Sequence, residues 1–142
     1  MKKVIMFILT MILMMTFAAC NQNESGSKWG ITLDAENVSS KGMTLVCHQL
    51  GGEDVFELQT GSMYGIQKLE NSKWVDITDN NRDWTSEAWT IQKDGTTKWE
   101  INWVGYCGEL PAGKYRIVKP ITNFRGPGDY DTEILYAEFS IN

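Results

Sequence analysis

Alternation of apolar and polar side chains is the sequence feature that most constrains the fold of this chain. In residues 96–104, tryptophan and isoleucine occupy the odd positions from 99 to 103, whereas lysine, glutamate and asparagine occupy the even ones. In residues 133–141, apolar residues occupy the odd positions from 135 onward. Because side chains alternate between the two faces of a strand, each segment would bury one face only. The pattern therefore predicts antiparallel sheets with one face toward solvent.

Short segments of the same kind, separated by turn residues, fill the chain beyond residue 28. They are rich in Trp, Tyr, Ile, Val and Thr, and clusters of Gly, Asn, Asp and Ser lie between them. This spacing predicts eight or nine strands in an all-β sandwich or barrel, with almost no helix. Residues 76–87 and 125–131 are expected to be loops, and residues 70–72 a hairpin turn. The expected strands cover residues 29–37, 43–49, 55–59, 62–69, 73–77, 88–92, 96–104, 114–121 and 133–141.

The first 19 residues have the composition of an export signal. A positive start, Met1 to Lys3, precedes an apolar run from Val4 to Phe17 and then two alanines. That order of regions is typical of a cleaved signal peptide. The apolar run is short for a membrane span, which needs about 20 residues. We therefore expect a signal peptide over residues 1–19, with an uncleaved single-span anchor as the alternative.

Residues 17–20, Phe-Ala-Ala-Cys, resemble the lipobox of bacterial lipoproteins, with Phe17 in place of the usual aliphatic residue. The resemblance implies that Cys20 receives a diacylglyceryl group, with fatty acids such as palmitate, and becomes the first mature residue. Two acyl chains anchor a protein stably, whereas one does so only marginally. The resemblance thus implies a lipid-anchored protein on the extracytoplasmic face of the cell membrane. The alternative is an ordinary secretory signal with a chance cysteine.

The chain after the signal peptide would form one domain behind a tether. Residues 20–142 number 123, which is enough for a single hydrophobic core. Polar residues with Gly and Ser predict a lipidated cysteine and tether over residues 20–28 and a domain over 29–142. Without Lys2 and Lys3 the chain has 11 basic and 18 acidic residues, a net charge of −7. This charge argues against binding to nucleic acid or to an anionic membrane surface.

Two cysteines, Cys47 and Cys107, remain in the expected domain. Outside the cytoplasm an even number of cysteines permits a disulfide. A bridge between them would close about 60 residues and stabilise the fold by roughly 4 kcal/mol in the chain-entropy treatment. The alternative is two buried thiols that behave as small apolar side chains. The sequence leaves both open, because it does not set the distance between the two Cα atoms.

Residues 110–117, Leu-Pro-Ala-Gly-Lys-Tyr-Arg-Ile, resemble the corner that leads into the sixth strand of many immunoglobulin-like domains. The resemblance implies that Tyr115 turns its hydroxyl back to the corner backbone and that Gly113 permits the tight turn. Antibody-type domains have a cysteine two residues after this tyrosine, where this chain has Ile117. Any bridge between Cys47 and Cys107 would therefore differ from the usual inter-sheet one.

A wider resemblance to a bacterial immunoglobulin-like domain family of exported proteins and lipoproteins covers roughly residues 30–142. It implies a β-sandwich of two antiparallel sheets outside the cytoplasm, with no established activity and no catalytic residues. The stretches that carry it are Tyr64–Leu69 with Trp74, and Ile101–Trp103, Gly108, Leu110–Lys119 and Glu138–Phe139.

No residue constellation in the sequence points to catalysis or to a cofactor. His48 is the only histidine and follows Cys47, but adjacent side chains of a strand point to opposite faces. Such a pair shares neither a proton nor a metal. No zinc spacing, nucleophile elbow or phosphate-binding glycine loop occurs. We therefore predict a protein that is not an enzyme and has no catalytic residue, cofactor or metal site.

The acidic loop over residues 76–87 holds two features of interest. Asp76, Asp79 and Asp83 offer carboxylate oxygens of the kind that calcium prefers, in a spacing unlike that of an EF-hand. The alternative is a solvated acidic loop. Trp84 stands among polar residues, where an exposed ring could stack on a sugar or anchor a protein. The alternative is a ring that folds down as a lid on the core.

The Gly- and Pro-rich loop over residues 125–131 is a second candidate contact surface, because loops at the ends of a sandwich often carry recognition. We predict Arg125, Asp129 and Tyr130, with Trp84, as contact residues; the alternative is a mere connector. The leading hypothesis is a non-enzymatic module that binds an envelope protein, such as a sensor or a protease. The second is a carbohydrate-binding module for cell-wall or environmental glycans. An enzyme built on an acidic pair comes third.

Overall fold

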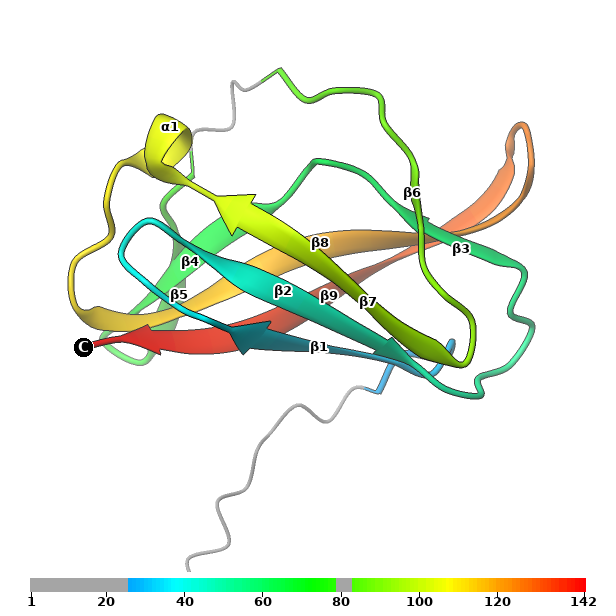
Figure 1. The fold of residues 1–142 in the computed structure, drawn as a ribbon, viewed down its shortest axis with the longest axis horizontal. Coiled ribbons are helices and arrows are strands. Elements are labelled where there is room, and N and C mark those ends of the chain that lie inside the picture. The colour runs from blue at the N-terminus through cyan, green and yellow to red at the C-terminus, as the bar shows by residue number, and fades with distance from the viewer. Residues whose placement is uncertain (1–25, 79–82) are drawn as a thin grey trace, which may run out of the picture.

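A computed structural model describes residues 26–78 and 83–142, which fold into two antiparallel sheets packed face to face (Figure 1). The smaller sheet has the order β1-β2-β7, and the larger has the order β5-β4-β8-β3-β6, with β9 paired to the other edge of β8. This arrangement confirms the predicted all-β sandwich of two antiparallel sheets. The elements are β1 (Ile31–Glu36), β2 (Gly42–Gln49), β3 (Glu57–Thr60), β4 (Gly65–Glu70), β5 (Lys73–Asp76), β6 (Trp89–Thr90), β7 (Gly95–Asn102), α1 (Val104–Cys107), β8 (Gly113–Gly126) and β9 (Asp129–Ile141).

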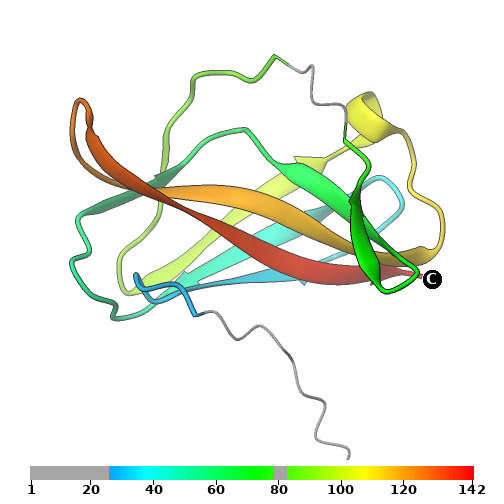
Figure 2. The ribbon, with the colours of Figure 1, turned by 180° about the vertical axis from the view of Figure 1, so that it is seen from behind.

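The β8–β9 hairpin is the longest feature of the fold and runs past the rest of the sandwich at its turn (Figures 1 and 2). Pairing extends from Gly113 opposite Ile141 to Gly126 opposite Asp129, with a bulge near the turn. The expected loop over residues 125–131 is therefore wrong in extent. Only Pro127 and Gly128 lie outside the strands, and Gly128 takes a positive φ of 75°, which glycine favours at the third position of a turn that has proline at the second.

Strands β3 and β4 both pair with one edge of β8, and the residues between these two strands are not paired with β8. β4 starts at Gly65 opposite Val118, whereas β3 is paired to β8 only as far as Gln59 opposite Thr122. The intervening part of β8 contains Pro120, which has no N–H to donate. The larger sheet therefore has a gap in its hydrogen-bond ladder in front of residues 61–64.

A tyrosine corner stabilises one end of the core. The Tyr115 hydroxyl donates to the Pro111 carbonyl at 2.8 Å, and the ring is fully buried. The Phe139 ring stacks on both Tyr115 and Trp103, with centroid separations of 5.6 and 5.3 Å. The Trp103 indole N–H donates to the Ser40 carbonyl at 2.7 Å, which satisfies its polar atom. The predicted role of Tyr115 is confirmed.

The alternation predicted for residues 96–104 is confirmed as far as Asn102, where β7 ends, and the prediction is wrong for Val104, which belongs to α1. In β7, Ile101 is buried and Trp99 half-buried, whereas Lys98 and Glu100 are exposed. The short helix α1 was not expected from the sequence. It follows the strand at once, and Gly108, with a φ of 72°, ends it.

The described chain begins at Gly26, three residues before the expected domain boundary. The Ser27 hydroxyl donates to the Glu133 carboxylate at 2.5 Å, and the Lys28 carbonyl accepts from the Glu53 amide at 2.9 Å. The last residues of the expected tether therefore pack on the domain. The signal peptide over residues 1–19 and Cys20 lie outside the described residues. Within the part that the structure describes, no helix has the length and hydrophobicity to cross a membrane.

The tyrosine corner yields a stability prediction. Tyr115→Phe should lower the free energy of unfolding by about 1–3 kcal/mol, because the Pro111 carbonyl loses its donor in a part-buried position. Tyr136→Phe is the matched control, since Tyr136 lies on the outer face of β9 and is 37% exposed. Urea denaturation of both variants checks the prediction. Equal losses in the two would show that the corner hydrogen bond contributes nothing.

Candidate functional site

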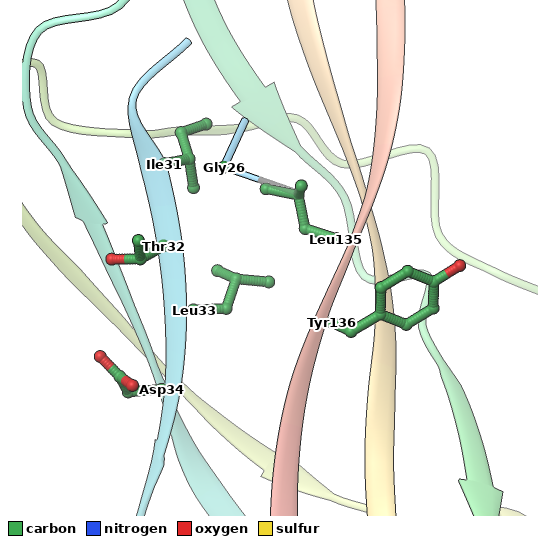
Figure 3. A pocket seen from close by; sticks show the side chains of 7 residues that line it. All are labelled: Gly26, Ile31, Thr32, Leu33, Asp34, Leu135 and Tyr136. Atoms are coloured by element: carbon green, nitrogen blue, oxygen red, sulfur yellow. The ribbon is translucent and has the colours of Figure 1, made fainter. Parts of the chain in front are cut away.

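The edges of the two sheets leave one hollow between β1 and β9, of about 280 Å³ (Figure 3). Ile31 and Leu33 of β1 and Leu135 of β9 point into the space between the strands (Figure 3). Gly26 also lines this edge hollow, so the chain enters the domain beside it. The apolar side chains of Ile31, Leu33 and Leu135 are buried parts of the core. Asp34 supplies the one carboxylate of the lining, and it lies 3.5 Å from His48.

A second hollow lies on the outer face of the larger sheet, beside the β8–β9 hairpin, with a volume of about 390 Å³. We call it the hairpin groove. Tyr130 is 57% exposed and Met63 46% exposed, so both side chains are accessible to a partner. Glu87 is the only charged residue in the lining. The lining is Gln59, Thr60, Gly61, Met63, Glu87, Ala88, Pro120, Thr122, Phe124, Tyr130 and Thr132.

The opposite side of the hairpin tip carries a charged cleft of about 320 Å³ that contains Arg125. Alternation along β8 sends Phe124 to the groove and Arg125 to this cleft. The guanidinium donates from Nε to Asp129 at 2.8 Å and from Nη1 to Asp131 at 2.9 Å. These hydrogen bonds, with Asp129 first, raise the pKa of Arg125, which stays charged. Arg125 also lies 5.7 Å from the Phe56 ring centroid.

The structure brings three of the four predicted contact residues together. Arg125, Asp129 and Tyr130 share the hairpin tip, as the sequence analysis expected. Trp84 lies with Tyr64 and Tyr106, at centroid separations of 5.2 and 5.9 Å, and packs half-buried against the core. Tyr106 belongs to α1, which Figures 1 and 2 show at the opposite end of the molecule from the tip. Trp84 is thus a lid on the core, which is the alternative that the sequence left open.

Sequence reasoning missed Lys119, a fully buried lysine beneath the groove. Its ammonium donates to the carbonyls of Gly61 and Met63, the latter at 2.9 Å, and lies 5.3 Å from the Trp89 ring centroid. It therefore fills the gap in the ladder between β3 and β4. Burial lowers the pKa of Lys119 from 10.5 to about 8. The signal was present in the sequence, because Lys119 shares the odd-numbered phase of Tyr115, which faces the core.

The disulfide alternative for Cys47 and Cys107 is not realised, and the two are not bridged to each other. Cys47 pairs with Thr97 in the middle of β2, whereas Cys107 follows β7 beyond Asn102. Along β7, Thr97 and Asn102 are five residues apart, which is roughly 17 Å of strand. A disulfide needs its two Cα atoms within about 7 Å of each other. Burial also raises the pKa of Cys47 to about 12, so its thiol stays protonated.

His48 lies on the face opposite Cys47, as alternation predicted. Its Nδ1 lies 2.9 Å from the Thr96 hydroxyl, and the ring is exposed. In the acidic loop, the Asp76 carboxylate accepts from the Thr78 hydroxyl at 2.7 Å, while Asp79 lies outside the described residues. Among residues 26–78 and 83–142, no three His, Cys, Asp or Glu side chains are grouped to hold a metal ion.

Comparison with known proteins gives one result on the family. The sequence model of a family described as bacterial Ig-like domain matches residues 25–140, which is nearly the whole described chain. No curated protein matches the chain.

Lys119 yields a prediction on pH. The folded state has the lower pKa, so the unfolded chain binds more protons between about pH 8 and 10.5. The contribution of Lys119 to the free energy of unfolding should therefore be constant below pH 8. It should rise by up to about 3 kcal/mol between pH 8 and pH 10.5. Lys119→Met should lack this rise. Urea denaturation of both proteins at several pH values from 7 to 10 measures the difference, and identical pH profiles would contradict the prediction.

Proposed function

The chain belongs to the bacterial Ig-like domain family, and from this premise we propose that it is a lipid-anchored protein whose domain binds a partner protein outside the cytoplasm. Domains of this family are typical of surface and exported proteins and are generally not catalytic. We propose the same for this chain: a binding module that is not an enzyme, held at the extracytoplasmic face of the cell membrane through Cys20.

The exposed Tyr130 ring beside the hairpin groove is the observation that carries the binding proposal. Tyrosine is enriched in the few interface residues that supply most of the binding free energy. The ring lies on a paired strand rather than on a flexible loop, and Arg125 ties both neighbours of Tyr130 together through Asp129 and Asp131. A tip held in one conformation loses little entropy when a partner binds. We therefore assign the partner contact to the outer face of this hairpin.

The point where the chain enters the domain supports this choice of surface. Five residues lie between Cys20 and Gly26, and the six steps from one Cα atom to the next allow at most about 20 Å of extended chain to the membrane. Because Gly26 lines the edge hollow between β1 and β9, a lipid on Cys20 would hold that hollow near the bilayer. The hairpin groove lies on the β3 side of β8, across the hairpin from the outer edge of β9.

A glycan is the second candidate partner, favoured by one feature of the groove. The Tyr130 ring lies in the same lining as the Gln59 amide and the hydroxyls of Thr122 and Thr132. An aromatic face flanked by neutral hydrogen-bonding groups suits a sugar ring. Binding of a panel of cell-wall polysaccharides, followed by tryptophan fluorescence, distinguishes this candidate from a protein partner.

The anchor yields a prediction on location. Cys20→Ser should abolish the incorporation of labelled palmitate and move the protein out of the membrane fraction, because two acyl chains supply the stable attachment. Cys107→Ser is the matched control, and it should keep both the label and the membrane fraction. Retention of Cys20→Ser in the membrane, without label, would favour an uncleaved single-span anchor instead.

The contact surface yields a prediction on partner capture. A photoreactive residue at Met63 should crosslink one protein in intact cells, and Tyr130→Ala should reduce that yield by about tenfold or more. The melting temperature should change little, because the ring is more exposed than buried. Tyr106→Ala is the control, since Tyr106 is 47% exposed at the other end of the molecule. An unchanged yield with Tyr130→Ala, or an equal loss with both variants, would contradict the assignment.

A further inference from the structure

We propose that the hairpin groove binds a basic segment of its protein partner, one that presents a bulky apolar side chain between lysine or arginine residues. This inference rests on the proposed function and adds the chemistry of the partner. It follows from two independent properties of the groove, its apolar lining and the sign of the charges around it.

The lining favours an apolar side chain. Met63, Pro120, Phe124 and Tyr130 are large apolar or aromatic members of the lining, and the volume of about 390 Å³ is sufficient for one or two large side chains. Met63 is 46% exposed, and methionine adapts its shape to the group that it contacts. Burial of apolar area at such a place contributes about 25 cal/mol per Å² before the costs of association.

The charges around the groove are mostly negative. Glu87 is the only charged residue of the lining, and Glu57 lies exposed on the same face, opposite Phe124 in the strand pairing. The Glu57 carboxylate accepts from the Gln59 amide at 2.8 Å, which places it at the groove lining. A lysine or arginine on the partner would meet these two carboxylates beside the apolar part of the lining.

The hairpin tip is also negatively charged. Asp129 and Asp131 flank Tyr130, and Arg125 supplies one positive charge for the two carboxylates. This surplus of one negative charge lies on the other side of the tip, where Asp131 and Arg125 line the charged cleft, and it adds to the negative potential around the groove at longer range. At the groove itself Glu57 and Glu87 give a charge of −2, and the buried ammonium of Lys119 brings it to −1 when that group is charged. Complementary charge speeds association and disfavours acidic competitors, so an acidic segment is excluded as well as a basic one attracted.

Three short synthetic peptides test the proposal with the full chain in detergent. The first alternates Lys with Leu and Phe; in the second, Glu replaces Lys, and in the third, Ser replaces Lys. By fluorescence anisotropy at low salt, the Lys peptide should bind about tenfold or more tightly than the other two. The affinity of the Lys peptide should fall when the ionic strength is raised above about 0.1 M, where the Debye length is shorter than about 10 Å.

Neutral variants with matched controls locate the effect. Glu57→Gln with Glu87→Gln removes two carboxylates at the groove and keeps their shape, and it should weaken the Lys peptide about fivefold. Asp34→Asn with Glu100→Gln removes two carboxylates from the outer face of the smaller sheet and should leave binding unchanged. Equal weakening by both pairs would mean that only the total charge matters, and that result would overturn the groove assignment.

The remaining outcomes separate this inference from the proposed function. Equal binding of the Lys and Ser peptides, or preference for the Glu peptide, would overturn the basic partner. If no peptide binds while the Met63 crosslink still depends on Tyr130, the basic partner is overturned and the protein-binding function stands. If the crosslink does not depend on Tyr130 and only a polysaccharide binds, both are overturned in favour of a glycan.

Discussion

The position of β8 between its partners is the constraint on which the rest of this structure depends. β9 pairs with one edge of β8 over nearly its whole length, and β4 and β3 share the other edge. Because side chains alternate, this one strand turns Tyr115 and Lys119 toward the core and Phe124 toward the groove. The tyrosine corner, the buried ammonium and the groove floor are therefore set by a single register. A slip of one residue would exchange the two faces and destroy all three features.

The buried lysine is best understood as compensation for the gap in the larger sheet. Where β3 ends and β4 has not begun, the carbonyls of Gly61 and Met63 face a part of β8 in which Pro120 cannot donate. A buried carbonyl without a donor costs about 1–3 kcal/mol. The Lys119 ammonium supplies donors to both carbonyls, and the Trp89 ring lies near its charge. The cost of burying one charge is thereby offset, and residues 61–63 keep the shape that forms one wall of the groove.

The sequence predicted the architecture well because period-two alternation and a tyrosine corner are local signals, readable in residues 96–104 and at Tyr115. It failed where a local signal has two structural meanings. Gly126 to Gly128 suggest a loop, but strand pairing on both sides reduces the turn to two residues. Polar neighbours suggest that Trp84 is exposed, although Tyr64 and Tyr106, distant in sequence, hold it against the core. The separation of Cys47 from Cys107 likewise depends on the register of β2 and β7, which composition does not determine.

The geometry of Arg125 changes the roles within the predicted contact group. Its guanidinium engages Asp129 through two nitrogens and Asp131 through the third, so few donors remain for a partner. A salt bridge between exposed groups contributes little to stability on average, about 0–1 kcal/mol. Its effect here is on conformation instead, because it fixes the residues on both sides of Tyr130. We therefore interpret Arg125 and Asp129 as the residues that position the tip and Tyr130 as the one that meets the partner. Since Arg125 neutralises only one of the two carboxylates, the tip remains negative and adds to the potential that Glu57 and Glu87 produce at the groove.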